Sequence, residues 1–261
     1  MEHTVQDTTR QPHLPPSSFR LCARDYLDSP EHKRHFNALL FREVAPRYDL
    51  ITRLLSFGRD SAWKRAMVKR LPAAATQALD IACGTGDLTR ALAHRYPNAQ
   101  IIGLDLTPEM LDRARARGSP PGVRFIEGNM QALPFPDNTF DVVTGGYALR
   151  NAPDLDAALR EIHRVLRPGG TLAVLDFSRS PTPLASRLQY ALLKCWGGMW
   201  GLLLHRHADV YGYIAESLQT FPDRPALRAR LRASGFTPVR FQTCMLGMLE
   251  LSLHHKESLA A

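Results

Sequence analysis

The stretch Ala78-Leu-Asp-Ile-Ala-Cys-Gly-Thr-Gly-Asp-Leu-Thr89 decides the fold of this 261-residue chain. Its residues 79–82 predict a short buried strand, and Gly84 and Gly86 then let the backbone turn tightly and approach a ligand. Asp105 closes a second apolar run, so its carboxylate is expected at the carboxyl end of the neighbouring strand, where it can hold a ribose diol. The pattern predicts a nucleoside-bearing cofactor in the crevice of an open α/β sheet.

The glycine turn also indicates the class of nucleoside cofactor. A dinucleotide site has the pattern Gly-x-Gly-x-x-Gly, but here Thr89 takes the third glycine position and Asp87 stands where a pyrophosphate would come. A carboxylate repels phosphate and suits a cationic ligand. The arrangement Asp80-x-x-x-Gly84-x-Gly86 is similar to the first motif of class I S-adenosylmethionine-dependent methyltransferases. That cofactor carries a sulfonium and an ammonium and no phosphate. The alternative is a strand-to-helix turn that binds no ligand.

Strands and helices alternate from residue 78 onward. The predicted strands cover residues 79–82, 100–104, 123–127, 140–144 and 171–177, and the predicted helices between them cover 88–95, 108–117 and 155–166. A further helix over 225–233 precedes two strands, one beginning at 239–241 and one over 242–253, which we expect to be antiparallel. The expected fold is α/β, with a doubly wound, mostly parallel, seven-stranded sheet of the Rossmann-like class I methyltransferase type.

The other segments predict a tail, a cap and an insertion. Residues 1–30 are polar and rich in proline, which favours a disordered tail. We expect residues 31–261 to form a single domain, in which helical patterning over 31–75 predicts an N-terminal helical cap. Residues 181–220 break the alternation and predict a lid-like insertion.

Composition narrows the compartment and the partners. The net charge is +8 and the isoelectric point is near 9.6, but the basic residues are spread along helical stretches such as 224–232, as on a solvated face, so no nucleic acid is expected. The four cysteines lie far apart and no apolar signal region opens the chain, which favours a reducing cytosol. The histidines have no cysteine or carboxylate at ligand spacing, and we expect no metal site.

Several narrower motifs accompany the glycine turn. They are Phe41-Arg-Glu-Val-Ala-Pro-Arg-Tyr-Asp49, Leu55-Ser-Phe-Gly58, Trp63-Lys-Arg65, Ala132-Leu-Pro-Phe-Pro-Asp-Asn-Thr-Phe-Asp141, Ala148-Leu-Arg-Asn151, Leu166-Arg-Pro-Gly-Gly170 and Tyr213-Ile-Ala-Glu-Ser217. Together they resemble the ubiquinone/menaquinone biosynthesis C-methyltransferase family over about residues 36–245. The resemblance implies an enzyme that methylates a ring carbon of a polyprenyl quinol with S-adenosylmethionine.

The resemblance also implies a set of cofactor-binding positions. These are Asp80, Gly84, Thr85, Gly86, Asp105, Leu106, Asn129, Met130 and Gly146, with Asn129 and Met130 beside the adenine. The family often has serine at the position of Gly146, so one hydroxyl contact is missing here. The C-terminal end also departs from the family pattern, so we expect that end of the pocket to differ in shape.

Methylation of ring carbon needs an electron-rich ring, and a quinol becomes nucleophilic when a hydroxyl loses its proton. Arg150 is the leading catalytic candidate because a guanidinium stabilises a phenolate and can orient a water; its alternative role is a helix cap or a surface ion pair. Tyr48 is the second catalytic candidate. The expected substrate contacts are Tyr48, Asp49, Arg150, Asn151 and Tyr213. The alternative for Tyr48 and Asp49 is that Tyr48 packs inside the cap and Asp49 is a helix N-cap.

The expected acceptor is demethylmenaquinol, with 2-polyprenyl-6-methoxy-1,4-benzoquinol as second choice. The alternatives are a small-molecule or secondary-metabolite methyltransferase and a non-catalytic binding subunit. Residues 184–204 are apolar but interrupted by charge, and Gly197-Gly198 should weaken a helix there. We expect this stretch to be a mobile apolar lid over the prenyl tail, or else an ordinary packed helix. The location expected is cytoplasmic, with peripheral contact at the inner membrane face and a homodimer as a further option.

Overall fold

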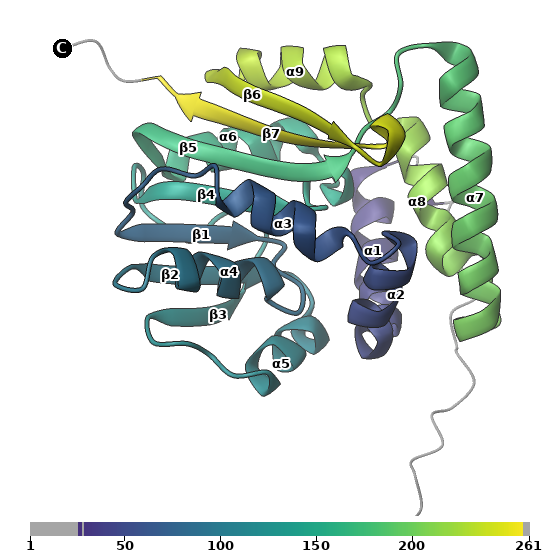
Figure 1. Cartoon of the computed structure of the whole chain (residues 1–261), viewed down its shortest axis with the longest axis horizontal. Helices are drawn as coiled ribbons and strands as arrows, with labels where there is room; N and C mark the ends of the chain where they lie inside the picture. Colours follow the sequence, from purple (N-terminus) through teal and green to yellow (C-terminus); the bar gives the residue numbers. More distant parts are fainter. Residues whose placement is uncertain (1–25, 28, 258–261) are drawn as a thin grey trace, which may run out of the picture.

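A seven-stranded sheet forms the centre of the molecule, in a computed structural model that describes residues 26–27 and 29–257 (Figure 1). The strand order is β3-β2-β1-β4-β5-β7-β6, and all neighbours are parallel except the pairs that involve β7. The strands are β1 (Gln77–Ile81), β2 (Gln100–Asp105), β3 (Val123–Glu127), β4 (Phe140–Gly146), β5 (Leu166–Phe177), β6 (Phe236–Cys244) and β7 (Leu249–Lys256). The predicted doubly wound sheet with an antiparallel end is confirmed.

Helices cover both faces of this sheet. One apolar cluster joins it to α3 (Asp60–Val68), α4 (Asp87–Arg95) and α5 (Pro108–Ala116). The opposite cluster joins it to α6 (Leu155–Val165), α8 (Asp209–Thr220) and α9 (Arg224–Ala233). Both faces of the central strands are therefore buried, which is why those strands are almost uniformly apolar in the sequence.

The predicted cap lies over the carboxyl ends of the parallel strands (Figure 1). It comprises α1 (Pro30–Val44), the 3-10 turn η2 (Ala45–Arg47) and α2 (Tyr48–Leu55), followed by α3. A third apolar cluster packs α1 and α2 against α8. The predicted tail falls mainly outside the described residues. Of its last residues, the Tyr26 ring centre lies 5.8 Å from that of Phe36, and Ser29 caps the first turn of α1.

Helix α7 (Pro183–His205) contains the two glycines that were expected to weaken a helix there. It is continuous for 23 residues and packs along α8, so Gly197-Gly198 does not break it. A Cβ on Gly197 would lie 2.6 Å from the Tyr211 carbonyl oxygen, so this glycine allows a close approach of the two helices rather than weakening one. Among the helices in the described residues, none has the length and apolarity to cross a membrane.

The C-terminal hairpin also differs from the expected strand over 242–253. β6 continues to Cys244, and a turn at Met245–Gly247 (η4) reverses the chain before β7 begins. The backbone turns there because Leu246 and Gly247 have φ of 54° and 83°, in the left-handed region. Apolar residues continue through this turn, so the hydrophobic pattern did not mark it.

Candidate active site

The glycine loop connects β1 to α4 and bends over the end of β2. Gly84 and Gly86 have φ of 54° and 79°, as the predicted turn requires. The Gly84 amide donates to Asp105 Oδ2 at 2.7 Å, and the Thr107 amide donates to Asp105 Oδ1 at 2.9 Å. Burial raises the pKa of Asp105 although these hydrogen bonds oppose the shift. Asp105 therefore fixes the loop and also borders the cavity below it.

Three of the predicted cofactor residues, Asp80, Thr85 and Gly86, support the glycine loop and do not line the cavity that Asp105 borders. Asp80 lies beneath it and accepts hydrogen bonds from Thr89 at 2.6 Å and Thr144 at 2.9 Å; burial raises its pKa to about 6. The Thr85 hydroxyl points to the cap instead. Gly86 packs toward the sheet, since a Cβ there would lie 2.8 Å from the Phe125 ring.

The first cavity, called the donor cavity here, has about 720 Å³ of empty space, its mouth included. It contains most of the predicted cofactor positions, namely Gly84, Asp105, Leu106, Asn129, Met130 and Gly146. A Cβ on Gly146 would be in ordinary van der Waals contact, with Leu88 Cδ2 at 3.8 Å as its nearest neighbour, so a side chain could start there without a clash. The donor cavity thus follows the carboxyl ends of β1, β2 and β4, where a nucleoside is expected in an open α/β sheet.

A second cavity, called the acceptor cavity here, has about 710 Å³ and is mainly apolar. Its walls come from the cap, from β4 and β5, from α8 and from the C-terminal hairpin: Leu40, Phe41, Val44, Tyr48, Ile51, Thr52, Leu55, Ser56, Trp63, Tyr147, Arg150, Asn151, Phe177, Val210, Tyr211, Tyr213, Ile214, Met245 and Leu249. Phe41, Tyr48, Tyr147 and Asn151 line both cavities. The two cavities therefore meet at these four side chains.

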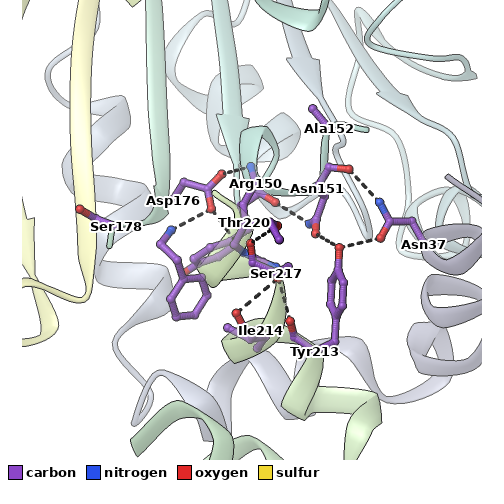
Figure 2. Close-up of polar contacts among 12 residues, drawn as sticks. Asn37, Arg150, Asn151, Ala152, Asp176, Ser178, Tyr213, Ile214, Ser217 and Thr220 are labelled. Carbon is purple, nitrogen blue, oxygen red and sulfur yellow. Dashed lines mark hydrogen bonds and ion pairs between the residues drawn. The ribbon is translucent and has the colours of Figure 1, made fainter. Parts of the chain in front are cut away.

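Arg150 is the charged group in the acceptor wall, and it is buried (4% exposed). It lies on the 3-10 turn η3 (Leu149–Asn151), and its guanidinium carbon lies 5.4 Å from the Phe177 ring centre and 5.4 Å from the Tyr213 ring centre. It donates to the Ser217 hydroxyl, and its amide donates to Asp176 Oδ2 at 3.0 Å (Figure 2). The structure thus places Arg150 in neither of its alternative roles, a helix cap or a surface ion pair.

Tyr213 and Asn151 belong to one hydrogen-bond network with a third residue, Asn37 of α1 (Figure 2). The Tyr213 hydroxyl lies 2.7 Å from Asn37 Oδ1 and 3.3 Å from Asn151 Oδ1. The Asn37 amide group donates to the Asn151 carbonyl at 2.7 Å. This network ties the cap and α8 to the turn that carries Arg150.

Tyr48 and Asp49 begin α2 and have different surroundings. Tyr48 reaches the glycine loop, where its ring would lie 3.6 Å from a Cβ on Gly84. Burial raises the pKa of Tyr48 to about 12. Asp49 does not cap α2. Its carboxylate accepts from the Thr85 hydroxyl at 2.5 Å and from Arg117 Nη1 at 3.0 Å, while Arg117 Nη2 lies 2.7 Å from Asp87 Oδ1. These contacts form a clasp between the cap and the glycine loop.

The sequence reasoning missed Tyr147 and Asn37. Tyr147 borders both cavities and directly follows Gly146 at the end of β4, so its place after a predicted strand was an available signal. Asn37 gave none, because it contacts the site only through the packing of α1. Within residues 26–27 and 29–257, no group of three or more His, Cys, Asp or Glu side chains could hold a metal.

Comparison with known proteins gives one consistent result. Residues 30–256 match the ubiE/COQ5 methyltransferase family. The chain is 42% identical over 212 residues to a demethylmenaquinone methyltransferase of Thermus thermophilus, which covers 80% of this chain and 96% of the relative. It is 36% identical to the ubiquinone/menaquinone biosynthesis C-methyltransferase UbiE of Hahella chejuensis, over 82% of this chain and 88% of the relative. A solved complex of a Haloferax volcanii putative methyltransferase with its Trm112 activator shows the same fold, with a TM-score of 0.62, 20% identity and coverage of 83% and 97%.

Proposed function

Because the chain belongs to the ubiE/COQ5 methyltransferase family, we propose that it methylates a ring carbon of a polyprenyl quinol, with demethylmenaquinol as the first acceptor. Membership confirms the resemblance of the motifs and makes the protein an S-adenosylmethionine-dependent methyltransferase. The names of both relatives support an acceptor of the quinol class. The benzoquinol precursor of ubiquinone is the second candidate, supported by the name of the Hahella protein.

The meeting of the two cavities is the observation that carries this proposal. A polar cavity edge with Asp105 and Asn129 suits the nucleoside of the cofactor, and the mainly apolar cavity suits an aromatic ring with a prenyl tail. Since Tyr48, Tyr147 and Asn151 border both, the reacting groups come together beside them. Bound S-adenosylmethionine supplies an electrophilic methyl group on a sulfonium. The cavity walls supply the orientation that makes an in-line transfer fast.

In this proposal Arg150 supplies the positive charge in the wall of the acceptor cavity. A buried guanidinium remains protonated, so it cannot take the quinol proton, but it stabilises the phenolate that remains. Its stacking on Phe177 and Tyr213 and its hydrogen bond to Ser217 fix its direction before a substrate enters. Asn151 and Tyr213 lie beside it and are the proposed hydroxyl contacts of the acceptor.

An activity assay with two acceptors tests the proposed function. Reduced demethylmenaquinol and the reduced benzoquinol precursor are each supplied with S-adenosylmethionine, and the methylated product is measured by mass spectrometry. We expect turnover of demethylmenaquinol, and a loss of about 100-fold or more in Arg150→Met, with cofactor affinity within about twofold of the wild type. Turnover of neither quinol by a wild-type protein that binds the cofactor would contradict the proposal.

We also propose that the outer face of α7 contacts the bilayer surface, from which a long-tailed quinol is taken, and that the protein works at the cytoplasmic face of the inner membrane. This outer face consists of exposed apolar side chains at helical spacing, Leu184, Leu188, Leu192, Met199, Leu202 and Leu203. It lies on the side of α7 away from α8, whose residues line the acceptor cavity. The net charge of +8 favours an anionic lipid surface as its occupant. A homodimer that covers the same face is the competing outcome of the test given below.

A further inference from the structure

Tyr147 has a strained backbone at the point where the two cavities meet. Its φ of 59° is in the left-handed region, which costs a residue other than glycine about 1–3 kcal/mol and persists only where the surroundings impose it. Here two hydrogen bonds impose it, one at the Tyr147 amide and one at the Tyr147 carbonyl. The Tyr147 amide donates to the Leu175 carbonyl at 2.6 Å, and the Asn151 side chain donates to the Tyr147 carbonyl at 2.8 Å. The side chain is therefore held in this position at a cost in stability.

A buried carboxylate lies behind the Tyr147 hydroxyl. The hydroxyl donates to Asp60 Oδ1 at 2.7 Å, and Asp60 is 5% exposed at the start of α3. Lys64 Nζ lies 2.8 Å from Asp60 Oδ2 and 5.9 Å from the centre of the Tyr147 ring. Although burial lowers the pKa of Lys64, the Asp60 carboxylate outweighs it, so the net shift is upward and the ammonium stays charged. The Tyr147 hydroxyl and the Lys64 ammonium thus contact different oxygens of the same buried carboxylate.

This hydroxyl has the connections that a proton relay needs. Burial, with Asp60 beside it, raises the pKa of Tyr147 well above its usual value, so the phenol does not ionise by itself. Its proton already points to the carboxylate, which leaves the oxygen lone pairs to accept a proton from a group in the cavity. Tyr190 and Tyr211 have similar backing, since the Tyr190 hydroxyl donates to Glu216 Oε1 at 2.8 Å and the Tyr211 hydroxyl lies 2.8 Å from His205 Nε2. Tyr190 lines neither cavity, however, and Tyr211 lines the acceptor cavity alone.

We propose that Tyr147 and Asp60 form a proton relay for the acceptor hydroxyl, an inference that rests on the proposed function. The acceptor O–H bond breaks as its proton moves to the Tyr147 oxygen, and the Tyr147 proton moves to Asp60 Oδ1. The ring carbon of the phenolate then forms a bond to the methyl carbon, and the carbon–sulfur bond breaks with its electron pair left on sulfur. The relay returns its proton to the acceptor oxygen, and the ring carbon loses its hydrogen to water as a proton. The net products are the methylated quinol, neutral S-adenosylhomocysteine and one proton, and Asp60 is ionised again.

Two variants and one control test the relay. Tyr147→Phe removes the hydroxyl, and Asp60→Asn keeps a hydrogen-bond acceptor but no base. The matched control is Tyr96→Phe, because Tyr96 is another buried tyrosine, its hydroxyl donates to the Pro72 carbonyl at 2.7 Å, and it lines neither cavity. For each protein we measure the single-turnover rate with reduced short-tailed demethylmenaquinol, the cofactor dissociation constant and the unfolding midpoint.

The acidity of the acceptor separates proton transfer from simple positioning. We expect each relay variant to lower the single-turnover rate by about 100-fold or more, with cofactor affinity within about twofold. With a halogen-substituted quinol, whose hydroxyl is more acidic, the loss of rate in both variants should be much smaller, because this hydroxyl gives up its proton more readily. The double variant should be no slower than the slower single variant. Tyr96→Phe should keep the wild-type rate.

The relay is wrong if Tyr147→Phe keeps the wild-type rate. It is also wrong if the loss of rate is equal with the ordinary and the acidic quinol, a result that would assign Tyr147 to positioning. Should Tyr147→Phe lose cofactor binding or folding, Asp60→Asn decides by the same acidity comparison. Turnover of no quinol by the wild type would contradict the proposed function itself, and the relay with it. Wild-type turnover with an unaffected Tyr147→Phe contradicts the relay alone.

Discussion

Lys33 shows how one side chain holds the turn that carries Arg150. Its ammonium donates to the carbonyl oxygens of Arg150 at 2.9 Å and Ala152 at 2.8 Å, from the first turn of α1. Burial, together with the nearby Arg150 charge, lowers the pKa of Lys33 to about 8, although Asp176 opposes the shift. The folded protein therefore releases this proton at a lower pH than the unfolded chain does.

The stability of the fold should respond to that release. Below pH 8 both states hold the proton, and the folded state carries the full cost of a buried ammonium. Between about pH 8 and 10.5 the folded state has lost the proton and the unfolded state still binds it, so unfolding becomes less favourable as pH rises. Relative to Lys33→Met, we expect the wild type to gain about 1–3 kcal/mol over this window, measured by urea unfolding at several pH values. A constant difference across the window would contradict the buried ammonium.

At this scale the sequence predicted Arg150 but neither Tyr147 nor Lys33. Arg150 belongs to a motif that could be matched residue by residue. The position of Tyr147 depends on a left-handed backbone, and Lys33 acts on carbonyl groups that are 117 and 119 residues away in the chain. The sequence marks the place of Tyr147 after a strand but not its backbone conformation, and it has no local signal for the contacts of Lys33.

Among the elements, the contact between α7 and α8 depends on glycines that look unfavourable in the sequence. A Cβ on Gly201 would lie 2.5 Å from the His207 carbonyl oxygen, whereas a Cβ on Gly198 would meet its nearest atom at 3.7 Å. We expect Gly201→Ala to destabilise the protein by about 1–3 kcal/mol, because the clash outweighs the gain in helix propensity. Gly198→Ala is the matched control and should be neutral or stabilising by up to about 1 kcal/mol. Equal urea midpoints for the two variants would contradict the close approach.

The clasp between the cap and the glycine loop should slow the exit of the cofactor. Arg117 lies between Asp49 of α2 and Asp87 of α4, and all three are partly exposed. Exposed pairs of this kind contribute about 0.2–1 kcal/mol, so Arg117→Gln should raise the cofactor dissociation rate about two- to fivefold in stopped-flow measurements. High salt should raise the wild-type rate in the same direction.

A control separates the clasp from a general loss of charge. Arg230 forms a comparably exposed pair with Asp156 at 2.8 Å and lines neither the donor nor the acceptor cavity. Arg230→Gln should leave the dissociation rate at its wild-type value. If both variants accelerate dissociation equally, the effect is one of net charge and the clasp has no role.

The elements were predicted more reliably than their ends. The parallel strands follow from runs of apolar residues, and the helices between them from their period, since both patterns are local. The turn at Met245–Gly247 was missed because it lies inside a continuous apolar stretch. The role of the α7 glycines was missed because it depends on the packing of α7 against α8. Tertiary contacts decided both cases.

For the whole molecule, the outer face of α7 and the positive charge should act together at a lipid surface. We expect more protein to sediment with vesicles of phosphatidylglycerol than with vesicles of phosphatidylcholine, and less of it as the salt concentration rises. Leu188→Ser with Leu192→Ser should lower the bound fraction and the turnover of a long-tailed quinol in vesicles, and leave turnover of a short-tailed quinol unchanged. The control is Val239→Ser on β6, an exposed apolar residue on another element.

The mass of the protein in solution distinguishes the lipid surface from a second copy of the chain. The double leucine variant should have the same mass as the wild type in light scattering. A change from dimer to monomer, with vesicle binding unaffected, would assign the outer face of α7 to a homodimer and contradict its contact with the bilayer.

The position of the C-terminal hairpin determines the order in which the two cavities can be completed during synthesis. Every residue that lines the donor cavity precedes position 154, whereas the acceptor cavity needs Met245 and Leu249 from the hairpin that fills the antiparallel end of the sheet. A chain emerging from the ribosome thus makes all of its donor-side residues well before the last acceptor-side ones. A chain that has not been synthesised through Leu249 therefore lacks part of the acceptor wall and has no complete place to hold the quinol.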